Sequence, residues 1–245
     1  MNLFWQFYPR VNGFGMFSLT HIRCLIILII LSYFIITYYL NNNTIQKRIA
    51  FIIGLVLLLL EMLFLILLII TNQFSYDQLP LQLCDLSAFI IFIDAIKSTK
   101  FTRAILYSLS MPGALAALIF PDWACNPIFN AFSIISFLVH TLLVMYPIMK
   151  IINKEIIPSF NDMIYNIIFL VICIPIMLEV NHLFNANFFF LSEAAPGSPL
   201  EPLQHMFGHY YILSALIMIL IIWSIMYLPW INKNKEYHQS YLNNK

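Results

Sequence analysis

The chain has 245 residues, of which 62% are hydrophobic and 9% are charged, and its formal net charge is +1. Soluble domains carry about 25% charged residues, so this composition excludes a soluble globular domain, and the near-zero net charge gives no sign of a nucleic-acid partner. The apolar runs are about 20 residues long, which fits membrane-spanning helices and not the shorter alternating strands of a barrel. We therefore expect an all-α, polytopic membrane protein.

Hydropathy predicts a bundle of seven transmembrane helices, preceded by an aromatic segment at the membrane surface that includes Phe4, Trp5 and Phe7. The connecting segments are short except for 184–206, so we predict a single integral membrane domain over residues 1–245. Kinks are expected at Pro112 and Pro175, because proline removes a backbone donor. The predicted spans are 20–40, 49–71, 79–97, 101–120, 128–149, 161–183 and 207–229.

Basic residues are concentrated on one side of this arrangement. The opposite side carries only Arg10 and Arg23. Because cytoplasmic loops are enriched in Lys and Arg, the pattern predicts an N-terminus outside and a C-terminus in the cytoplasm. The residues on the basic side are Lys47, Arg48, Lys97, Lys100, Arg103, Lys150, Lys154, Lys233, Lys235 and Lys245.

Several ionisable side chains fall inside the predicted spans, where each costs about 2.5–3.5 kcal/mol. At about 1.5 Å of rise per residue, none of them lies in the cytoplasmic quarter of the bilayer. We therefore predict a polar cavity that opens toward the outer side. The alternative is that these groups only hydrogen-bond one another between helices. They are Glu61, Asp85, Asp94, His140 and Glu179.

Helical phase places further polar groups on two faces. The third span carries a stripe at i, i+3 and i+10, while Asp85 points about 100° away from its first member. Two such faces are expected to meet inside the bundle. The stripe of the third span is Cys84, Ser87 and Asp94, and that of the fifth span, at i, i+3 and i+7, is Ser133, Ser136 and His140.

Cys84 is a candidate nucleophile. Pro80 suits the first turn of a helix, so the thiol would lie near the positive end of the helix dipole, which favours the thiolate. Two alternatives remain: a small apolar residue in a helix, or a disulfide with Cys125 of the next outer loop. We expect neither a cofactor nor a metal. A metal site is the alternative, because Glu179 with His182, and His205 with His209, would each place two metal-binding side chains on one helix face.

Several motifs resemble the YwaF-like integral membrane proteins of bacteria, a family related to the vertebrate transmembrane protein 164. The resemblance covers nearly the whole chain, and its most specific part is Leu79-Pro80-Leu81-Gln82-Leu83-Cys84-Asp85 followed by a histidine in the fifth span. The other matching segments are Phe17-Ser18-x-x-His21, Glu61, Phe120-Pro121-Asp122, Ser136-x-x-x-His140 and Asn187-Phe188-x-Phe190-Leu191.

The resemblance implies acyl transfer between lipids through an acyl-thioester, with Cys84 as nucleophile and His140 as general base. Helix rise alone separates these two residues by about 12 Å along the membrane normal. Spacing alone instead pairs His140 with Asp94 or Glu61. A carboxylate that orients His140, which in turn serves Cys84, would reconcile the two.

Our leading hypothesis is a lipid acyltransferase or thioesterase-like enzyme of the bacterial cell membrane, with membrane phospholipids as partners. The catalytic candidates are Cys84, His140, Asp94 and Glu61. A small-solute transporter or binding protein with the same polar cavity is the alternative, and the sequence leaves the oligomeric state open. The substrate-binding candidates are Ser87, Ser136, Ser133, Asn187 and His21.

Overall fold

The computed structural model describes residues 3–7 and 11–243, with side chains described up to residue 231. All the regular secondary structure of the described part is helical, with no strand, as the composition predicted. Short 3₁₀ turns join the longer elements. The α-helices are α1 (Leu19–Asn41), α2 (Gln46–Ile70), α3 (Leu83–Ile96), α4 (Lys100–Ile105), α5 (Met111–Ile119), α6 (Ala131–Ile152), α7 (Met163–Phe184), α8 (Leu200–Phe207) and α9 (Tyr211–Asn243).

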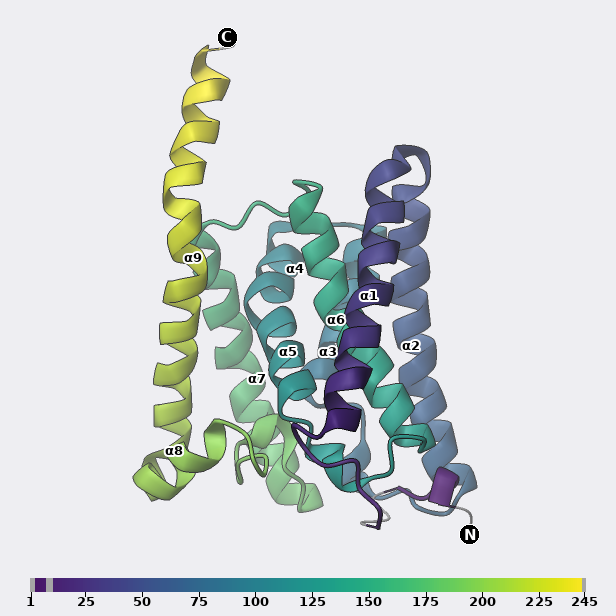
Figure 1. Ribbon diagram of the computed structural model, residues 1–245. Coiled ribbons are helices and arrows are strands. Elements are labelled where there is room, and N and C mark those ends of the chain that lie inside the picture. Colours follow the sequence, from purple (N-terminus) through teal and green to yellow (C-terminus); the bar gives the residue numbers. More distant parts are fainter. Residues whose placement is uncertain (1–2, 8–10, 244–245) are drawn as a thin grey trace.

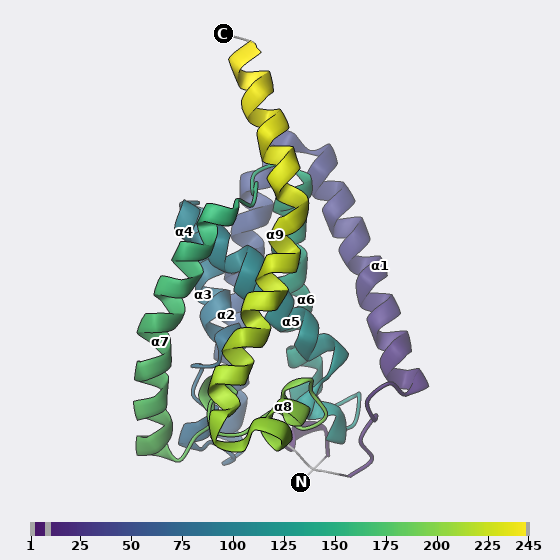
Figure 2. The same cartoon turned by 90° about the vertical axis from the view of Figure 1, so that its left-hand side faces the viewer.

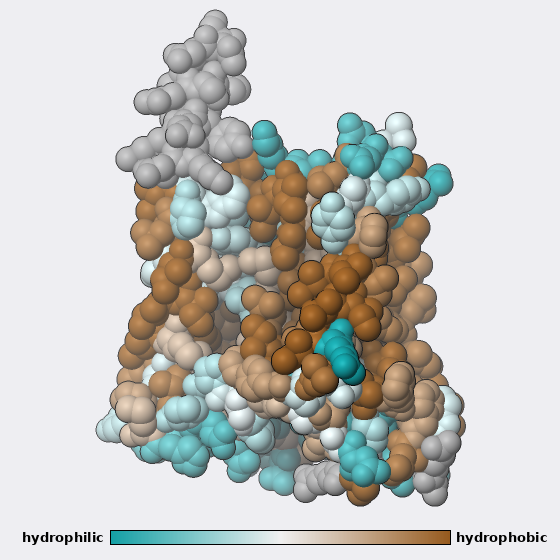
Figure 3. Space-filling view, viewed as in Figure 1, coloured by the Kyte–Doolittle hydropathy of each residue, from teal (hydrophilic) through white to brown (hydrophobic). Residues whose placement is uncertain are grey.

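Seven segments are long and apolar enough to cross a membrane, which confirms the predicted number of spans. A broad apolar band separates two more polar ends of the molecule (Figure 3). The last of these segments includes α8, but Gly208 (φ 49°, ψ −112°) breaks the helix, and α8 turns away from the axis of α9 (Figure 1). The seven segments are Leu19–Asn41, Asn43–Ile70, Tyr76–Ile96, Lys100–Cys125, Ala131–Ile152, Phe160–Phe184 and Leu200–Ile231.

Successive spans run in opposite directions, so the first turn of the chain and the last turns of α9 lie at opposite ends of the bundle (Figures 1 and 2). We call the end that holds residues 71–82, 120–130 and 185–210 the amino-terminal end. The opposite, carboxyl-terminal end holds residues 42–45, 97–99 and 153–162. The predicted cytoplasmic location of the carboxyl-terminal end stays a prediction. Arg10 and Lys245 lie outside the described residues, as do the side chains of Lys233 and Lys235.

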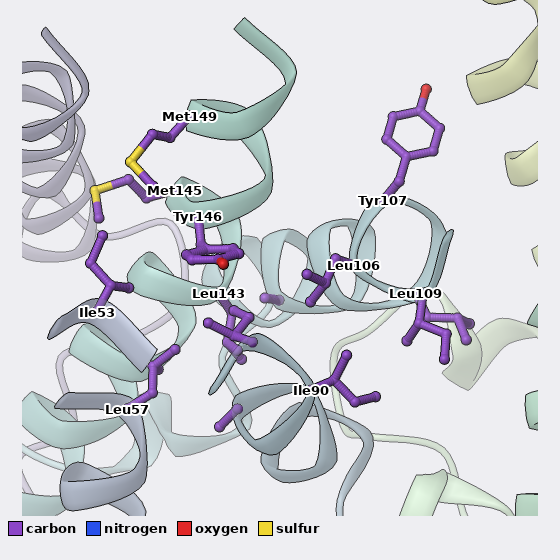
Figure 4. Packing of buried hydrophobic residues seen from close by; sticks show 14 of the residues in the cluster. Ile53, Leu57, Ile90, Leu106, Tyr107, Leu109, Leu143, Met145, Tyr146 and Met149 are labelled. Atoms are coloured by element: carbon purple, nitrogen blue, oxygen red, sulfur yellow. The ribbon is translucent and has the colours of Figure 1, made fainter. Parts of the chain in front are cut away.

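The centre of the bundle is formed by α2, α3, α6 and the fourth span. Leu57, Ile91 and Leu143 are fully buried there (Figure 4 shows the surrounding cluster). Gly54 allows α2 to pack closely on α3, because a Cβ atom at this position would lie 2.9 Å from Phe92 Cα. This close approach fixes the positions of α2 and α3, which carry Glu61 and Asp85, two residues of the site described below.

The fourth span is irregular near Pro112. Here α4 continues into a π-helical turn, Leu106–Ser110, before α5 begins. Pro112 has no N–H group with which to bond the carbonyl of Ser108. The indole Nε1 of Trp223 in α9 donates to that carbonyl instead, at 2.7 Å. The wide turn therefore anchors α9 to the bundle.

Candidate active site

Polar side chains from α2, α3 and α6 line a cavity of about 100 Å³ near the amino-terminal end of the bundle. A water molecule takes about 30 Å³ in the liquid, so the cavity has room for a few waters or one polar group, and not for a whole lipid. It brings together the predicted Glu61, Ser136 and His140, and it adds Asp85. The lining residues are Glu61, Phe64, Leu65, Gln78, Pro80, Asp85, Ile135, Ser136, Val139 and His140.

Asp85 reaches the cavity from the first turn of α3. Its carboxylate Oδ2 accepts a hydrogen bond from the backbone N–H of Gln82 at 2.8 Å, which caps the helix where the dipole favours negative charge. Its carboxyl group also lies within hydrogen-bonding reach of that of Glu61. Ionised carboxylates only accept hydrogen bonds, so a bond between these two groups requires a proton on one of them. The cavity therefore contains a carboxyl pair suited to sharing a proton.

The His140 ring is held in a defined orientation. Its Nδ1 lies 2.7 Å from the carbonyl oxygen of Ser136. A carbonyl only accepts, so Nδ1 carries the hydrogen, and Nε2 of the neutral ring keeps its lone pair. Nε2 has no hydrogen-bond partner among the described residues. Trp123 stacks on the ring with a centroid distance of 5.0 Å and an interplanar angle of 30°. His140 is thus arranged to accept a proton through Nε2.

Cys84 lies next to Asp85 on the first turn of α3, but it is not among the residues that line the cavity. It is partly buried and packs against the central cluster. Its Sγ has no hydrogen-bond partner among the described residues, His140 included. None of the four cysteines, all of which lie within the described residues, forms a disulfide, so the disulfide hypothesis for Cys84 and Cys125 is wrong.

Asp94 lies far from the cavity. It follows Asp85 by nine residues, which is about 13 Å along α3. Its carboxylate lies 3.1 Å from Lys150 Nζ and accepts hydrogen bonds from Thr102 Oγ1 at 2.6 Å and Tyr146 OH at 3.0 Å. The structure therefore does not bring Asp94 to His140. The reason is that Lys150, expected near the aqueous surface, is buried and pairs with Asp94.

The same ion pair continues into the connection after α6. Lys150 Nζ lies 3.2 Å from Glu155, and the Tyr39 hydroxyl and the Asn153 amide both donate to that carboxylate. Burial alone would raise the pKa of Glu155. The two hydrogen bonds and the Lys150 charge outweigh this effect, so the pKa of Glu155 lies below its ordinary value. This cluster ties α1, α3 and α6 together at the carboxyl-terminal end.

Three other predicted binding residues are buried away from the cavity. Ser87 is buried and donates to the carbonyl of Leu83 at 2.7 Å. Ser133 is buried, and its Oγ has no hydrogen-bond partner among the described residues. His21 uses both ring nitrogens on the backbone: Nδ1 accepts from Phe17 N–H at 3.1 Å, and Nε2 donates to the Leu118 carbonyl at 2.9 Å. None of the three lines the cavity.

Asn187 closes its own loop. Its Oδ1 accepts from the N–H groups of Ser192 and Glu193 at 3.0 and 3.1 Å, and its Nδ2 donates to the Glu193 carbonyl at 2.8 Å. These bonds occupy the amide that we expected to bind substrate.

The four residues of the metal alternative do not converge. All four side chains are exposed. The carboxylate that lies 3.9 Å from His205 Nε2 belongs to Glu201, which is not one of the four. The described part of the chain holds no group of three or more His, Cys, Asp or Glu side chains arranged for a metal ion. The residues concerned are Glu179, His182, His205 and His209.

Sequence reasoning missed Gln78 and Trp123, and it counted Asp85 among the ionisable groups of the spans without naming it as a catalytic or binding candidate. The predicted angle of about 100° between the Asp85 and Cys84 side chains around the helix agrees with the structure. The cavity lies on the face of α3 that carries Asp85. The signal that could have found it is the carboxylate three residues after Gln82, in the capping position of a helix start. Trp123 lies in a single 3₁₀ turn, Asp122–Cys125, which is too short for periodicity to give a direction.

The model of the TMEM164 family matches residues 16–227, which include every residue of the cavity. The chain belongs to the TMEM164 family. No curated protein and no solved structure matches it. Family membership and the seven spans together establish a multi-pass membrane protein of the TMEM164 family. The relation to transmembrane protein 164 expected from the sequence motifs is thereby confirmed.

Proposed function

We propose that this TMEM164 family member transfers acyl groups between membrane lipids, with Cys84 as nucleophile and His140 as general base. The observation that carries the proposal is the state of His140. Its Nδ1–H is held by the Ser136 carbonyl, and its Nε2 lone pair is free in a polar cavity within an apolar bundle. A positioned base with this tautomer is what activation of a neighbouring thiol requires.

The reaction has two half-reactions with the proton accounted for in each. His140 Nε2 takes the proton of the Cys84 thiol, and the thiolate attacks the ester carbonyl of a phospholipid. The C–O bond breaks, and the leaving alkoxide takes the proton from His140, which leaves an acyl-thioester on Cys84. The hydroxyl of a second lipid then gives its proton to His140 and attacks the thioester. Cys84 leaves as thiolate and recovers the proton from His140.

The start of α3 supports the charge changes at the thiol. The N–H groups of Leu83 and Cys84 have no partner among the described residues, because the first N–H groups of a helix lack intrahelical acceptors. They can stabilise the thiolate and the oxyanion that forms on the carbonyl. Bringing Cys84 Sγ to His140 Nε2 requires a movement of the first turn of α3. Catalytic hydrogen bonds are commonly long in free enzymes and tighten when substrate binds.

The carboxyl pair of Glu61 and Asp85 takes the role that we had considered for Asp94. It lines the same cavity as His140 and stabilises the imidazolium that forms during each half-reaction. Met62 and Leu63, which follow Glu61 on α2, are 49% and 43% exposed. This face of α2 borders the lipid, so acyl chains can stay in the bilayer while only the ester group enters the small cavity.

The distribution of basic residues supports an outward-facing cavity, because the amino-terminal end lies opposite the basic loops. We propose on this basis that the protein acts on the outer leaflet of a bacterial cell membrane. The site would take phospholipids directly from that leaflet.

One observation favours a second candidate function. Glu61, Asp85 and His140 line the cavity, whereas Cys84 does not. Three protonatable groups around a small cavity also suit a small-solute transporter or binding protein that takes up a solute together with a proton. In that case Cys84 would be a packing residue of α3.

The two functions are separated by an acyl-transfer assay on purified protein in phospholipid vesicles, with an alkyne-tagged acyl phospholipid as donor and a lysophospholipid as acceptor. We expect transfer by wild type, and loss of transfer in Cys84→Ser and His140→Ala. Cys173→Ser, in α7, is the matched control and should transfer normally. Transfer by Cys84→Ser at the wild-type rate would end the proposal.

A further inference from the structure

The connection between α7 and α8 is hydrogen-bonded to the start of α3. The Gln82 side chain makes both bonds: its Oε1 accepts from the N–H of Phe189 at 2.9 Å, and its Nε2 donates to the carbonyl of Asn187 at 3.3 Å. The backbone N–H of the same Gln82 donates to Asp85 in the cavity. One residue therefore joins the distant connection to a carboxylate of the candidate active site.

The bonded segment, residues 187–191, is called the aromatic strap. Phe189 and Phe190 have φ angles of 60° and 52°, in the left-handed region that residues other than glycine adopt only when their surroundings impose it. Asn181 of α7 supplies part of that support: its Oδ1 accepts from Phe188 N–H at 2.7 Å, and its Nδ2 donates to the Phe188 carbonyl at 3.0 Å. The strap is thus held in one conformation by side-chain amides.

The strap also packs against the residues that lead into α3. Phe188 is fully buried, and Leu79 and Leu81 pack against its cluster. Leu79, Leu81 and Gln82 all precede Cys84 by five residues or fewer. The strap therefore contacts the approach to α3 through an apolar cluster and through the two bonds of Gln82.

We propose that Gln82 is a positioning residue, which uses the strap to set the direction of the first turn of α3 and hence of Cys84 and Asp85. This inference rests on the proposed acyl transfer. Gln82 is the last residue before the helix, with ψ at 158°, so its conformation decides where the helix axis starts. Without the two strap bonds, Asp85 would still cap the first turn of α3, but Gln82 would no longer tie that turn to the strap.

The test compares Gln82→Met with Gln204→Met. Methionine keeps the length of the side chain and removes its hydrogen bonds. Gln204 is the matched control because it binds the same connection, accepting from Ala194 N–H at 2.9 Å and donating to the Ser192 carbonyl at 3.4 Å, and neither of these hydrogen bonds involves α3. Two quantities are measured: the rate of acyl transfer, and the rate at which a maleimide labels Cys84 in a protein whose other three cysteines are serine.

We expect Gln82→Met to lower acyl transfer about tenfold, the effect of losing two hydrogen bonds of ordinary strength, and to raise maleimide labelling of Cys84. Unfolding would also lower transfer and raise labelling, so both rates are compared only for variants whose free energy of unfolding equals that of wild type. Gln204→Met should change neither rate. Unchanged rates in Gln82→Met, or equal changes in the two variants, would overturn the inference. Should Gln82→Met not fold, Gln82→Glu, which keeps the acceptor for Phe189 and loses the donor to Asn187, should label at Cys84 faster than wild type, and a wild-type labelling rate would refute the inference.

The two proposals can fail separately. If wild type shows no acyl transfer, the proposed function fails, while labelling of Cys84 in the two glutamine variants still decides whether Gln82 sets the start of α3. If wild type transfers acyl groups and Gln82→Met does so equally well, only the positioning role fails.

Discussion

Replacing Lys150 with Met is expected to destabilise the protein more than replacing its partner Asp94 with Asn. Asp94 and Lys150 are 1% and 4% exposed, and their charged atoms lie 3.1 Å apart. Lys150→Met leaves a buried carboxylate with two hydroxyl donors and no cation. Breaking a buried pair from one side costs about 3–5 kcal/mol.

Asp94→Asn leaves a different situation. The Lys150 ammonium keeps Glu155 at 3.2 Å, and the new amide oxygen can still accept from the Thr102 and Tyr146 hydroxyls. We therefore expect a loss of about 1–3 kcal/mol, the cost of a weakened buried hydrogen-bond set. The double variant should lose less than Lys150→Met alone, because it contains no unpaired buried carboxylate.

The free energy of unfolding can be measured by denaturation with sodium dodecyl sulfate in mixed micelles, with Lys154→Met as an exposed control that should change little. Equal losses for Lys150→Met and Asp94→Asn would refute the asymmetry. The same variants test the role of Asp94 in the reaction. We expect folded Asp94→Asn to retain acyl transfer, because its side chain lies near the other end of α3 from the cavity.

Two further predictions concern packing and pH. Gly54→Ala should destabilise the protein by about 1–3 kcal/mol, because the added Cβ would lie 2.9 Å from Phe92 Cα. Gly113→Ala, whose added Cβ would have its nearest neighbour at 3.9 Å, should be neutral or slightly stabilising in the same unfolding assay. Equal effects of the two substitutions would contradict this prediction. Because the pKa of Glu155 is lowered in the folded state, its stabilising contribution should be complete above its unfolded pKa of about 4.3 and decline as the pH falls through the lower folded value. The stability difference between wild type and Glu155→Gln, measured from pH 7 to pH 3, should therefore shrink at low pH, and a constant difference would contradict the assignment.

The spans could be predicted because each is long and apolar enough to need the bilayer, and this requirement is local in the chain. The meeting of Glu61 with Ser136 and His140 was also predictable, since polar groups in a membrane helix turn toward other helices. In both cases the signal lies within single helices: the length of the apolar run in one case, and the polar groups that each helix turns inward in the other.

The remaining site residues depend on contacts between segments distant in sequence. The rotation of α3 against α2 decides that Asp85, and not Cys84, lines the cavity, and residue spacing fixes only the angle between the two. Asp94 was assigned to the cavity because depth alone cannot show that Lys150 is buried and pairs with it. Asn187 lies in a loop, where the hydrogen bonds that occupy its amide follow no period.

The central claim is that Cys84 carries an acyl group with the help of His140. The most direct measurement is the intact mass of the protein after brief incubation with a phospholipid donor and no acceptor. We predict an added acyl mass on Cys84 that neutral hydroxylamine removes, present in wild type and Cys173→Ser and absent from Cys84→Ser and His140→Ala. An unmodified wild-type protein in vesicles where donor lipid is consumed, or an adduct that persists in Cys84→Ser, would contradict the claim.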